Sequence, residues 1–130
     1  MKYTKEEMLS KVDHPLLKPE ATWPQIRTLC DEAIANHCAS VCINTCYVAK
    51  AAEYMAGRVP VCCVVGFPLG AMDTKSKAFE AKTAIENGAS EVDMVINIGW
   101  LKNKQYDDVR NDIAAVKAAV GDKVLKVIIE

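Results

Sequence analysis

The segment EVDMVINI, residues 91–98, is rich in branched apolar residues and carries one aspartate, Asp93, near its start. Apolar residues at this density favour a strand that is covered on both faces, as in a parallel sheet. A carboxylate is almost never fully buried unless it has a partner. The segment therefore predicts a buried strand in which Asp93 has a specific role.

Three further segments have the same character and lie on either side of this one. They are ASVCIN (39–44), VPVCCVVGF (59–67) and KVLKVIIE (123–130). Each is separated from the next by a stretch in which apolar residues recur at helical spacing. Strands that alternate with helices indicate βαβ units and a parallel sheet. The sequence thus predicts an α/β protein with about four parallel strands.

The helices are marked by their end signals. Residues 4–11 predict a short first helix, and DHPLLKPEA (13–21) predicts a loop because it contains two prolines. Thr22 and Gln25 have the spacing of a capping box at the start of the next helix. The helix after the first strand should end at Gly57, and the one after the second should begin at Asp73 or Thr74. A longer helix carries Val109, Ile113, Val116 and Val120.

Polar residues inside the strands recur with period two, which places them on one face. These sets are Ser40, Cys42 and Asn44; Asp93, Val95 and Asn97; and Lys126, Ile128 and Glu130. An open doubly wound sheet would bury these side chains under helices. A (βα) barrel would point them into its interior, where catalytic residues project near the carboxyl ends of the strands. The pattern favours the barrel, preceded by N-terminal helices.

The chain length, the net charge and the lengths of the apolar runs exclude several classes of function. The chain has 130 residues, enough for one domain, and a net charge of −1, so no nucleic-acid partner is expected. No apolar run approaches the roughly 20 residues of a membrane span, and residues 1–14 lack the apolar core of a signal peptide. We therefore expect no membrane partner and a cytoplasmic location.

Six cysteines are present, and Cys38, Cys42 and Cys46 are evenly spaced beside His37. This spacing differs from the paired ligands of common zinc sites. Cys42 and the Cys62–Cys63 pair lie within apolar segments, where a reduced thiol packs as a small hydrophobe. We expect neither disulfides nor a metal, although a cysteine-based metal or redox module stays open as a third hypothesis.

The segments DHPLLKPEAT, ASVCIN, VCCVVGFPLGA, FEAKTAIENGASEVDMVINIG and KVLKVIIE together resemble the 2-deoxyribose-5-phosphate aldolase family, from about Val12 to Glu130. The resemblance implies a class I aldolase on a (βα)8 barrel. Such an enzyme cleaves 2-deoxy-D-ribose 5-phosphate to glyceraldehyde 3-phosphate and acetaldehyde through a lysine Schiff base, without a metal or other cofactor. Its Schiff-base lysine lies in a K-T-S-T-G motif, which these 130 residues do not contain. The expectation is half a barrel that is inactive alone.

The same resemblance assigns roles to individual residues. Asp93 and Lys126 correspond to catalytic positions, with Asp93 working through water in proton transfer and Lys126 beside it. The positions that correspond to substrate contacts are Asp13, Leu17, Cys42, Asn44 and Phe67. The chain departs from the usual pattern at Pro15, at Thr45–Cys46 and at Met72–Asp73, which affects the expected fine contacts with a sugar phosphate.

Simpler roles compete with each of these. Asp93 could bond to backbone groups at a strand end, and Cys42 could only pack. Lys126 could form a structural ion pair or extend to solvent at an exposed edge. At the level of the whole chain, one hypothesis is the N-terminal half of an aldolase, and the other is an inert half-barrel that pairs with a copy of itself.

Self-association is expected because a half-barrel has two unpaired sheet edges, predicted at residues 39–44 and 123–130. Its inner face should present apolar side chains to water, namely Val61, Cys63, Val65, Phe67, Val95 and Ile128. Two copies with four strands each would restore eight. We therefore expect a homo-oligomer.

Overall fold

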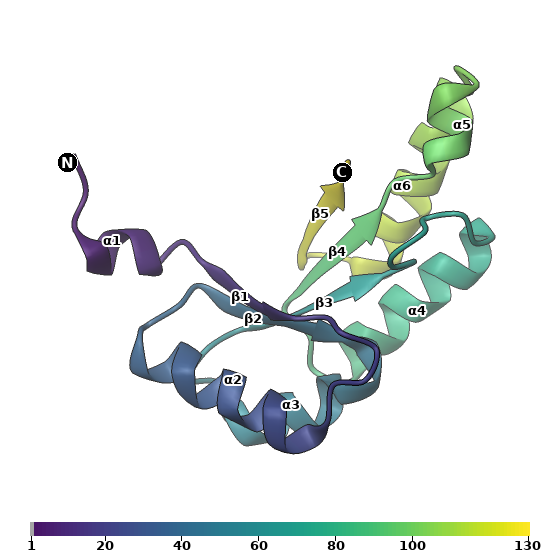
Figure 1. Ribbon diagram of the computed structural model, residues 1–130. Coiled ribbons are helices and arrows are strands. Elements are labelled where there is room, and N and C mark those ends of the chain that lie inside the picture. The colour runs from purple at the N-terminus through teal and green to yellow at the C-terminus, as the bar shows by residue number, and fades with distance from the viewer. Residues whose placement is uncertain (1) are drawn as a thin grey trace.

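The computed structural model describes residues 2–130, which form one parallel sheet flanked by helices (Figure 1). The sheet has five strands in the order β1-β2-β3-β4-β5, and each neighbouring pair is parallel. The strands are β1 Asp13–Leu16, β2 Ser40–Asn44, β3 Val61–Val65, β4 Glu91–Val95 and β5 Val124–Ile128. The predicted α/β architecture of successive βα units is confirmed.

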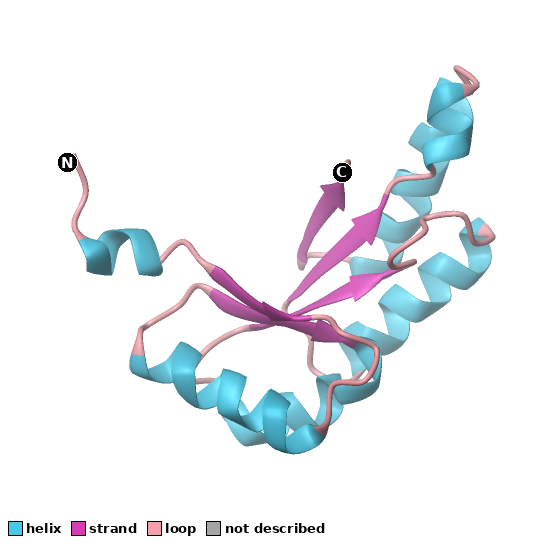
Figure 2. Ribbon diagram, viewed as in Figure 1, coloured by secondary structure: helices cyan, strands magenta, loops and turns pink. Residues whose placement is uncertain are grey.

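The helices alternate with these strands, and the four longest of the described helices lie on one side of the sheet (Figure 2). The helices are α1 Lys5–Leu9, α2 Trp23–Ala35, the 3-10 turn η1 Thr45–Tyr47, α3 Val48–Met55, α4 Thr74–Glu86, α5 Ile98–Lys102 and α6 Tyr106–Val120. The largest cluster of buried apolar side chains lies between these helices and the sheet. The opposite face of the sheet is not covered by α2, α3, α4 or α6.

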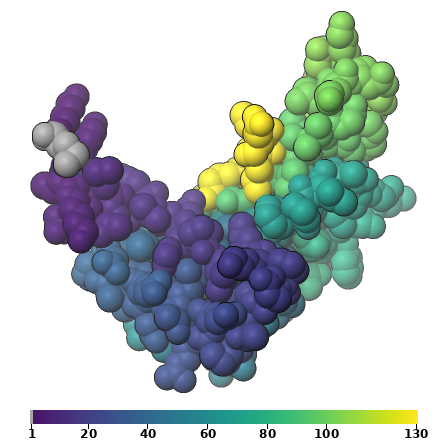
Figure 3. All heavy atoms as spheres, in the orientation of Figure 1, coloured from purple at the N-terminus to yellow at the C-terminus, as the bar shows by residue number. Residues whose placement is uncertain are grey.

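The sheet is curled like the wall of a barrel. In a flat sheet, the first and fifth strands would lie about 19 Å apart, at about 4.8 Å per step. Here Lys126 on β5 donates a hydrogen bond to Asp13 on β1, with Nζ 2.5 Å from Oδ2. Two side chains cannot span the flat distance, so the strands must curve toward one another. Figure 3 shows the resulting hollow between the N-terminal arm and the C-terminal strand.

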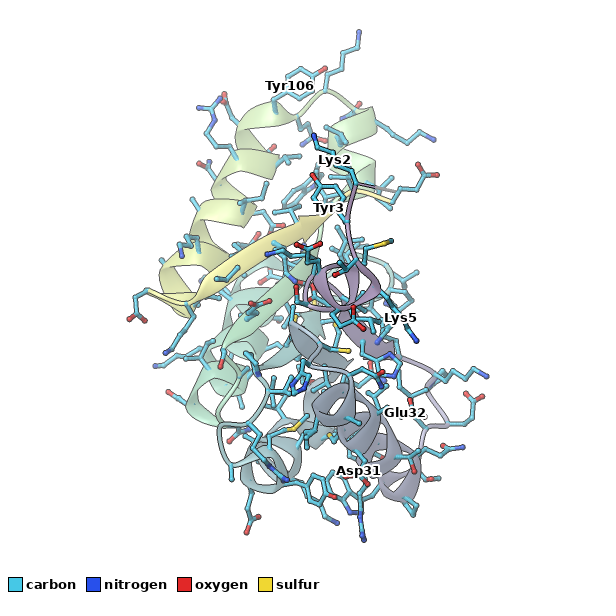
Figure 4. The ribbon with its side chains drawn as sticks, turned by 90° about the vertical axis from the view of Figure 1, so that its left-hand side faces the viewer. Lys2, Tyr3, Lys5, Asp31, Glu32 and Tyr106 are labelled. Carbon is cyan, nitrogen blue, oxygen red and sulfur yellow. The ribbon has the colours of Figure 1, made fainter. Side chains whose placement is uncertain are left out.

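The predicted loop at residues 13–21 is partly wrong, because its first four residues form β1. The two prolines suggested a loop, but Pro15 stands opposite Cys42 in an edge strand that pairs only with β2. An edge strand tolerates proline, since one row of its N–H groups needs no partner. His14 anchors this strand to α2, with Nε2 2.7 Å from Oε2 of Glu32, which is labelled in Figure 4.

The additional strand β1 changes which strands form the edges of the sheet and how many strands two copies would contain. The sheet edges are β1 and β5, not the segment 39–44 and β5 as expected. Two copies would bring ten strands rather than eight, so a closed eight-stranded barrel made of two whole sheets is not available.

No helix in residues 2–130 is long and apolar enough to cross a bilayer.

The predicted inner face of β3 is wrong by one residue. Val61, Cys63 and Val65 pack into the main core with the helices, so they do not face the hollow. Cys62 and Val64 occupy the inner face, and they are buried with Cys42 beneath Leu17 and Ile128. A strand that is apolar at every position gives no alternation from which its two faces can be assigned.

The end signals of the helices are largely confirmed. The backbone N–H of Thr22 donates to Oε1 of Gln25 at 2.9 Å, which completes the start of α2. Asp73 caps α4 by accepting a hydrogen bond from the N–H of Lys75 at 2.9 Å. Ala56 and Gly57 both have positive φ at the end of α3. The short helix α5 was not predicted, and Asn97 caps it instead of continuing β4.

Candidate active site on the inner face of the sheet

Lys126 is the centre of a charge cluster on the inner face. Its ammonium nitrogen lies 2.5 Å from Oδ2 of Asp13, 3.2 Å from Oε2 of Glu91 and 3.2 Å from Oδ1 of Asp93. Asp13 also accepts a hydrogen bond from the Ser40 hydroxyl at 2.7 Å. One ammonium is therefore surrounded by three carboxylates that come from β1 and β4.

Strand register explains why these residues meet. Asp93 and Lys126 are direct partners in the β4–β5 ladder, and Asp13 is the partner of Ser40 in the β1–β2 ladder. Glu91 lies two residues before Asp93, on the same face of β4. The curl of the sheet then brings β1 opposite β5, which closes the cluster across the hollow.

The cluster fixes the charge state of Lys126. Burial by itself would lower the pKa of this ammonium, but the hydrogen bonds to Asp13 and Glu91 and the charge of Asp93 outweigh burial and raise the pKa. A lysine acts as a nucleophile when its pKa is depressed. The geometry therefore keeps Lys126 as a cation, and it favours an electrostatic role over a nucleophilic one.

The same contact shifts the pKa of Asp13 in the opposite direction. Burial alone would raise the pKa of its carboxyl, but hydrogen bonds from Lys126 and Ser40 and the charge of Lys126 lower it overall. Asp13 is thus held as an anion that locks the Lys126 side chain. In the described chain it contacts other protein groups, whereas the resemblance assigned it to the substrate.

Asp93 links the charge cluster to the thiols of the inner face. Its side chain is 16% exposed, and its Oδ1 is buried without a well-aligned hydrogen bond among the described residues, despite lying 3.2 Å from the ammonium. Its Oδ2 lies 4.0 Å from Sγ of Cys42. A carboxylate with an incompletely satisfied oxygen beside a fixed cation is well placed to accept or return a proton.

Besides Asp13, three of the predicted substrate-contact residues lie on the same face, namely Leu17, Cys42 and Asn44. Leu17 packs over the buried Cys42, and the Asn44 amide donates to the carbonyl of Leu17 at 3.3 Å. Phe67 does not join them. It is 39% exposed after β3 and lines a cleft of about 410 Å³ with Leu69, Met72 and neighbouring residues, none of which belongs to the charge cluster.

Comparison with known proteins decides the family. The model of the DeoC/LacD family aldolases matches residues 8–130. The chain belongs to this family. The deoxyribose-phosphate aldolase of Clostridioides difficile is 55% identical over 125 residues, which cover 96% of this chain and 57% of that protein.

Two solved structures extend the comparison of this DeoC/LacD family chain. A protein from Coccidioides immitis described as a deoxyribose-phosphate aldolase superposes with a TM-score of 0.90 at 46% identity, over 92% of this chain and 48% of that one. The tetrameric deoxyribose phosphate aldolase of Aeropyrum pernix gives 0.80 at 31% identity, over 94% and 52%. The chain thus spans about half the length of the relatives it matches.

The charge cluster of this family member lies deeper than the barrel rule predicts. Asp13, Ser40 and Glu91 are the first residues of their strands, and Asp93 and Lys126 are each the third of five. Catalytic groups of barrels gather at the carboxyl ends. Lys126 therefore points toward the amino-terminal end of the sheet, where it forms the floor of the hollow.

The sequence did not lead us to predict one buried polar network, which is centred on Lys77 and Asp112. Lys77 on α4 is completely buried, and its ammonium donates to Oδ2 of Asp112 at 2.7 Å, to the carbonyl of Gly70 at 3.0 Å and to that of Val95 at 3.1 Å. The Thr74 hydroxyl donates to the other oxygen of Asp112 at 2.7 Å. The network fastens the β3–α4 loop to the end of β4 and to α6.

A signal for this network was present in the sequence. Lys77 shares a helical stripe with Ala81 and Ala84 at spacings of four and three, and Asp112 lies four residues before Val116. Opposite charges on the buried stripes of two helices that follow successive strands predict a buried pair. Glu91 could likewise have been found, because it lies two residues before Asp93.

Proposed function

We propose that this chain forms the charged side of the catalytic pocket of a deoxyribose-phosphate aldolase that acts on 2-deoxy-D-ribose 5-phosphate. The observation that carries the proposal is the Lys126 ammonium held among Asp13, Glu91 and Asp93 on the inner face of the curled sheet. Membership of the DeoC/LacD family and the names of the relatives support the choice of substrate.

The charge balance suits chemistry that passes through a cation. If all three carboxylates are ionised, one ammonium leaves the cluster with a net charge of −2 (1 − 3). A protonated imine formed on a neighbouring lysine would be stabilised by this surplus of negative charge. The resemblance implies that such a lysine comes from a K-T-S-T-G segment. Lys126 then supplies fixed charge, and Asp93 moves the proton, with no metal or cofactor in the reaction.

A chimaera tests the proposal. This chain would replace the matching part of the Clostridioides difficile relative, and cleavage of 2-deoxyribose 5-phosphate would be followed by coupled reduction of the aldehyde product. We expect retro-aldol activity, and Asp93→Asn should lower kcat about 10²–10⁴-fold with little change in KM, since general acid–base help is typically of that size. Thr83→Ala, at a half-buried position on α4 outside the charge cluster, is the control and should keep full activity.

An inactive but folded chimaera would refute the proposal, and a kcat preserved within a few-fold in Asp93→Asn would make Asp93 structural. The 130-residue chain alone should give no activity. Borohydride reduction in the presence of substrate should also leave its intact mass unchanged. A stoichiometric adduct on Lys126 would instead make that lysine the nucleophile.

The partners and setting follow the same line. We propose self-association, supported by the unpaired edges β1 and β5 and by the tetrameric relative from Aeropyrum pernix. We propose a cytoplasmic setting, since all six cysteines are free thiols and reducing compartments keep them so.

A further inference from the structure

Two thiols and a carboxylate converge on the inner face of the sheet. Cys42 and Cys62 are direct partners in the β2–β3 ladder, and Asp93 follows on β4 opposite Val64. One sulfur from each cysteine and one oxygen of Asp93 all lie within 4.8 Å of one another. These side chains come from three adjacent strands, so the backbone holds them in place.

The spacing is close to that of a metal site. With metal–sulfur bonds of about 2.3 Å and metal–oxygen bonds of about 2.0 Å, tetrahedral zinc places sulfur and oxygen about 3.5 Å apart and two sulfurs about 3.8 Å apart. The observed separation between Sγ of Cys42 and Oδ2 of Asp93 is 4.0 Å. The other two separations are at most 4.8 Å, so binding requires rotations about the side-chain bonds of Cys42, Cys62 and Asp93 that bring the three atoms closer together.

We propose that Cys42, Cys62 and Asp93 form a binding site for a thiophilic divalent cation such as Zn²⁺ or Cd²⁺. Three protein ligands leave a fourth tetrahedral position for water, as in open zinc sites. The two thiols lose their protons to solvent when the ion binds, and the resulting thiolates with the carboxylate offset its charge. The alternative is that the thiols only pack with Val64 beneath Leu17 and Ile128.

Asp93 connects this site to the charge cluster. Its Oδ2 faces the thiol of Cys42, and its Oδ1 lies 3.2 Å from the Lys126 ammonium. An ion held through Oδ2 therefore has Lys126 as an outer-sphere neighbour that keeps the carboxylate oriented. If the proposed aldolase function holds, the same ion removes Asp93 from proton transfer and inhibits the enzyme.

Cadmium titration of the 130-residue chain tests the site without using activity. Binding of Cd²⁺ by thiolates produces an ultraviolet charge-transfer band, and we expect one ion per chain. Loss of an outer-sphere partner typically weakens metal binding about 10–100-fold. Loss of a direct ligand should cost at least as much, so Cys42→Ser and Cys62→Ser should each weaken Cd²⁺ binding by about 10-fold or more. Asp93→Asn should also weaken it. Cys46→Ser, which removes an exposed thiol, is the control and should change nothing.

A band that survives in Cys42→Ser and Cys62→Ser, or one that is lost in Cys46→Ser, would overturn the proposal. Alkylation of the unsubstituted chain gives a second test if a variant fails to fold. Bound Cd²⁺ should protect Cys42 and Cys62 from a thiol reagent during slow opening of the fold while Cys46 still reacts. Equal labelling with and without the ion would also refute the site. Failure here leaves the chimaera result untouched, so the two proposals can fail separately.

Discussion

Lys77→Met should strongly destabilise the fold, because it breaks a completely buried ion pair. The side chains of Lys77 and Asp112 are 0% and 1% exposed, with Nζ 2.7 Å from Oδ2. Removing one member of such a pair leaves an uncompensated buried charge and costs about 3–5 kcal/mol. The carbonyls of Gly70 and Val95 lose the same donor. A domain of this size has a total stability of about 5–15 kcal/mol, so the folded state of the variant should be marginal.

Urea unfolding followed by circular dichroism measures this effect at one fixed protein concentration, since self-association would add a concentration dependence. Lys82→Met is the matched control on the same helix. Lys82 lies 3.9 Å from Glu86, and both side chains are more than half exposed, at 64% and 62%. Loss of such a surface pair should cost about 0.5 kcal/mol or less.

A double-mutant cycle separates the buried charge from the lost packing. Lys77→Met combined with Asp112→Leu replaces the pair by apolar side chains of similar size, and such replacements are often neutral or stabilising. The double variant should therefore be more stable than either single variant. The reasoning is refuted if Lys77→Met costs less than about 1 kcal/mol, or if the double variant loses the sum of the two single effects.

Three further predictions follow from backbone space, charge and sheet edges. In urea unfolding, Gly70→Ala should destabilise the fold far more than Gly57→Ala. Both glycines have positive φ, but a Cβ on Gly70 would lie 2.2 Å from the carbonyl oxygen of Ile96, whereas a Cβ on Gly57 would meet open space. Equal losses of stability in the two variants would contradict this. The pKa of Asp13 is lowered below 3.8, so its carboxylate stabilises the fold above pH 3.8 and loses that contribution as pH falls through the folded pKa. The difference in unfolding free energy between the unsubstituted chain and Asp13→Asn should therefore shrink in acid. A difference that stays constant with pH would count against the hydrogen bond to Lys126. Sedimentation at micromolar concentration should show self-association through β5, because β1 is short and contains Pro15; a stable folded monomer would be inconsistent with this.

The alternation of helices and strands was predictable because local signals agreed with the tertiary fold. Capping residues such as Thr22 and Asp73 act within a few residues of the chain, so they are visible in the sequence. The proline in β1 misled the prediction because proline disfavours strands only where both rows of backbone groups are paired. Whether a segment lies at a sheet edge depends on the whole topology, which no local window contains.

The site was predictable only where polarity alternates. Ser40, Cys42 and Asn44 identify the inner face of β2 because apolar neighbours separate them. The run Val61–Val65 contains no such contrast, so the inner position of Cys62 could not be derived, and the thiol pair with Cys42 was missed. Lys77 was missed for another reason, since lysine on a helix is usually exposed and only its pairing with Asp112 reverses that expectation.

Lys126 connects the shape of the sheet with the chemistry of its inner face. A lysine in a buried strand is costly unless carboxylates surround it, and those available are on β1 and β4. Asp13 can reach Lys126 only if the sheet curls, so the ion pair that satisfies the lysine also favours curvature. Curvature in turn brings Asp93, Cys42 and Leu17 around one hollow. The residues on opposite sides of the hollow are therefore brought together by the same contact that keeps Lys126 protonated, whereas Cys42, Cys62 and Asp93 are already neighbours through the strand ladders. A change that frees this lysine should alter the shape of the sheet as well as its charge.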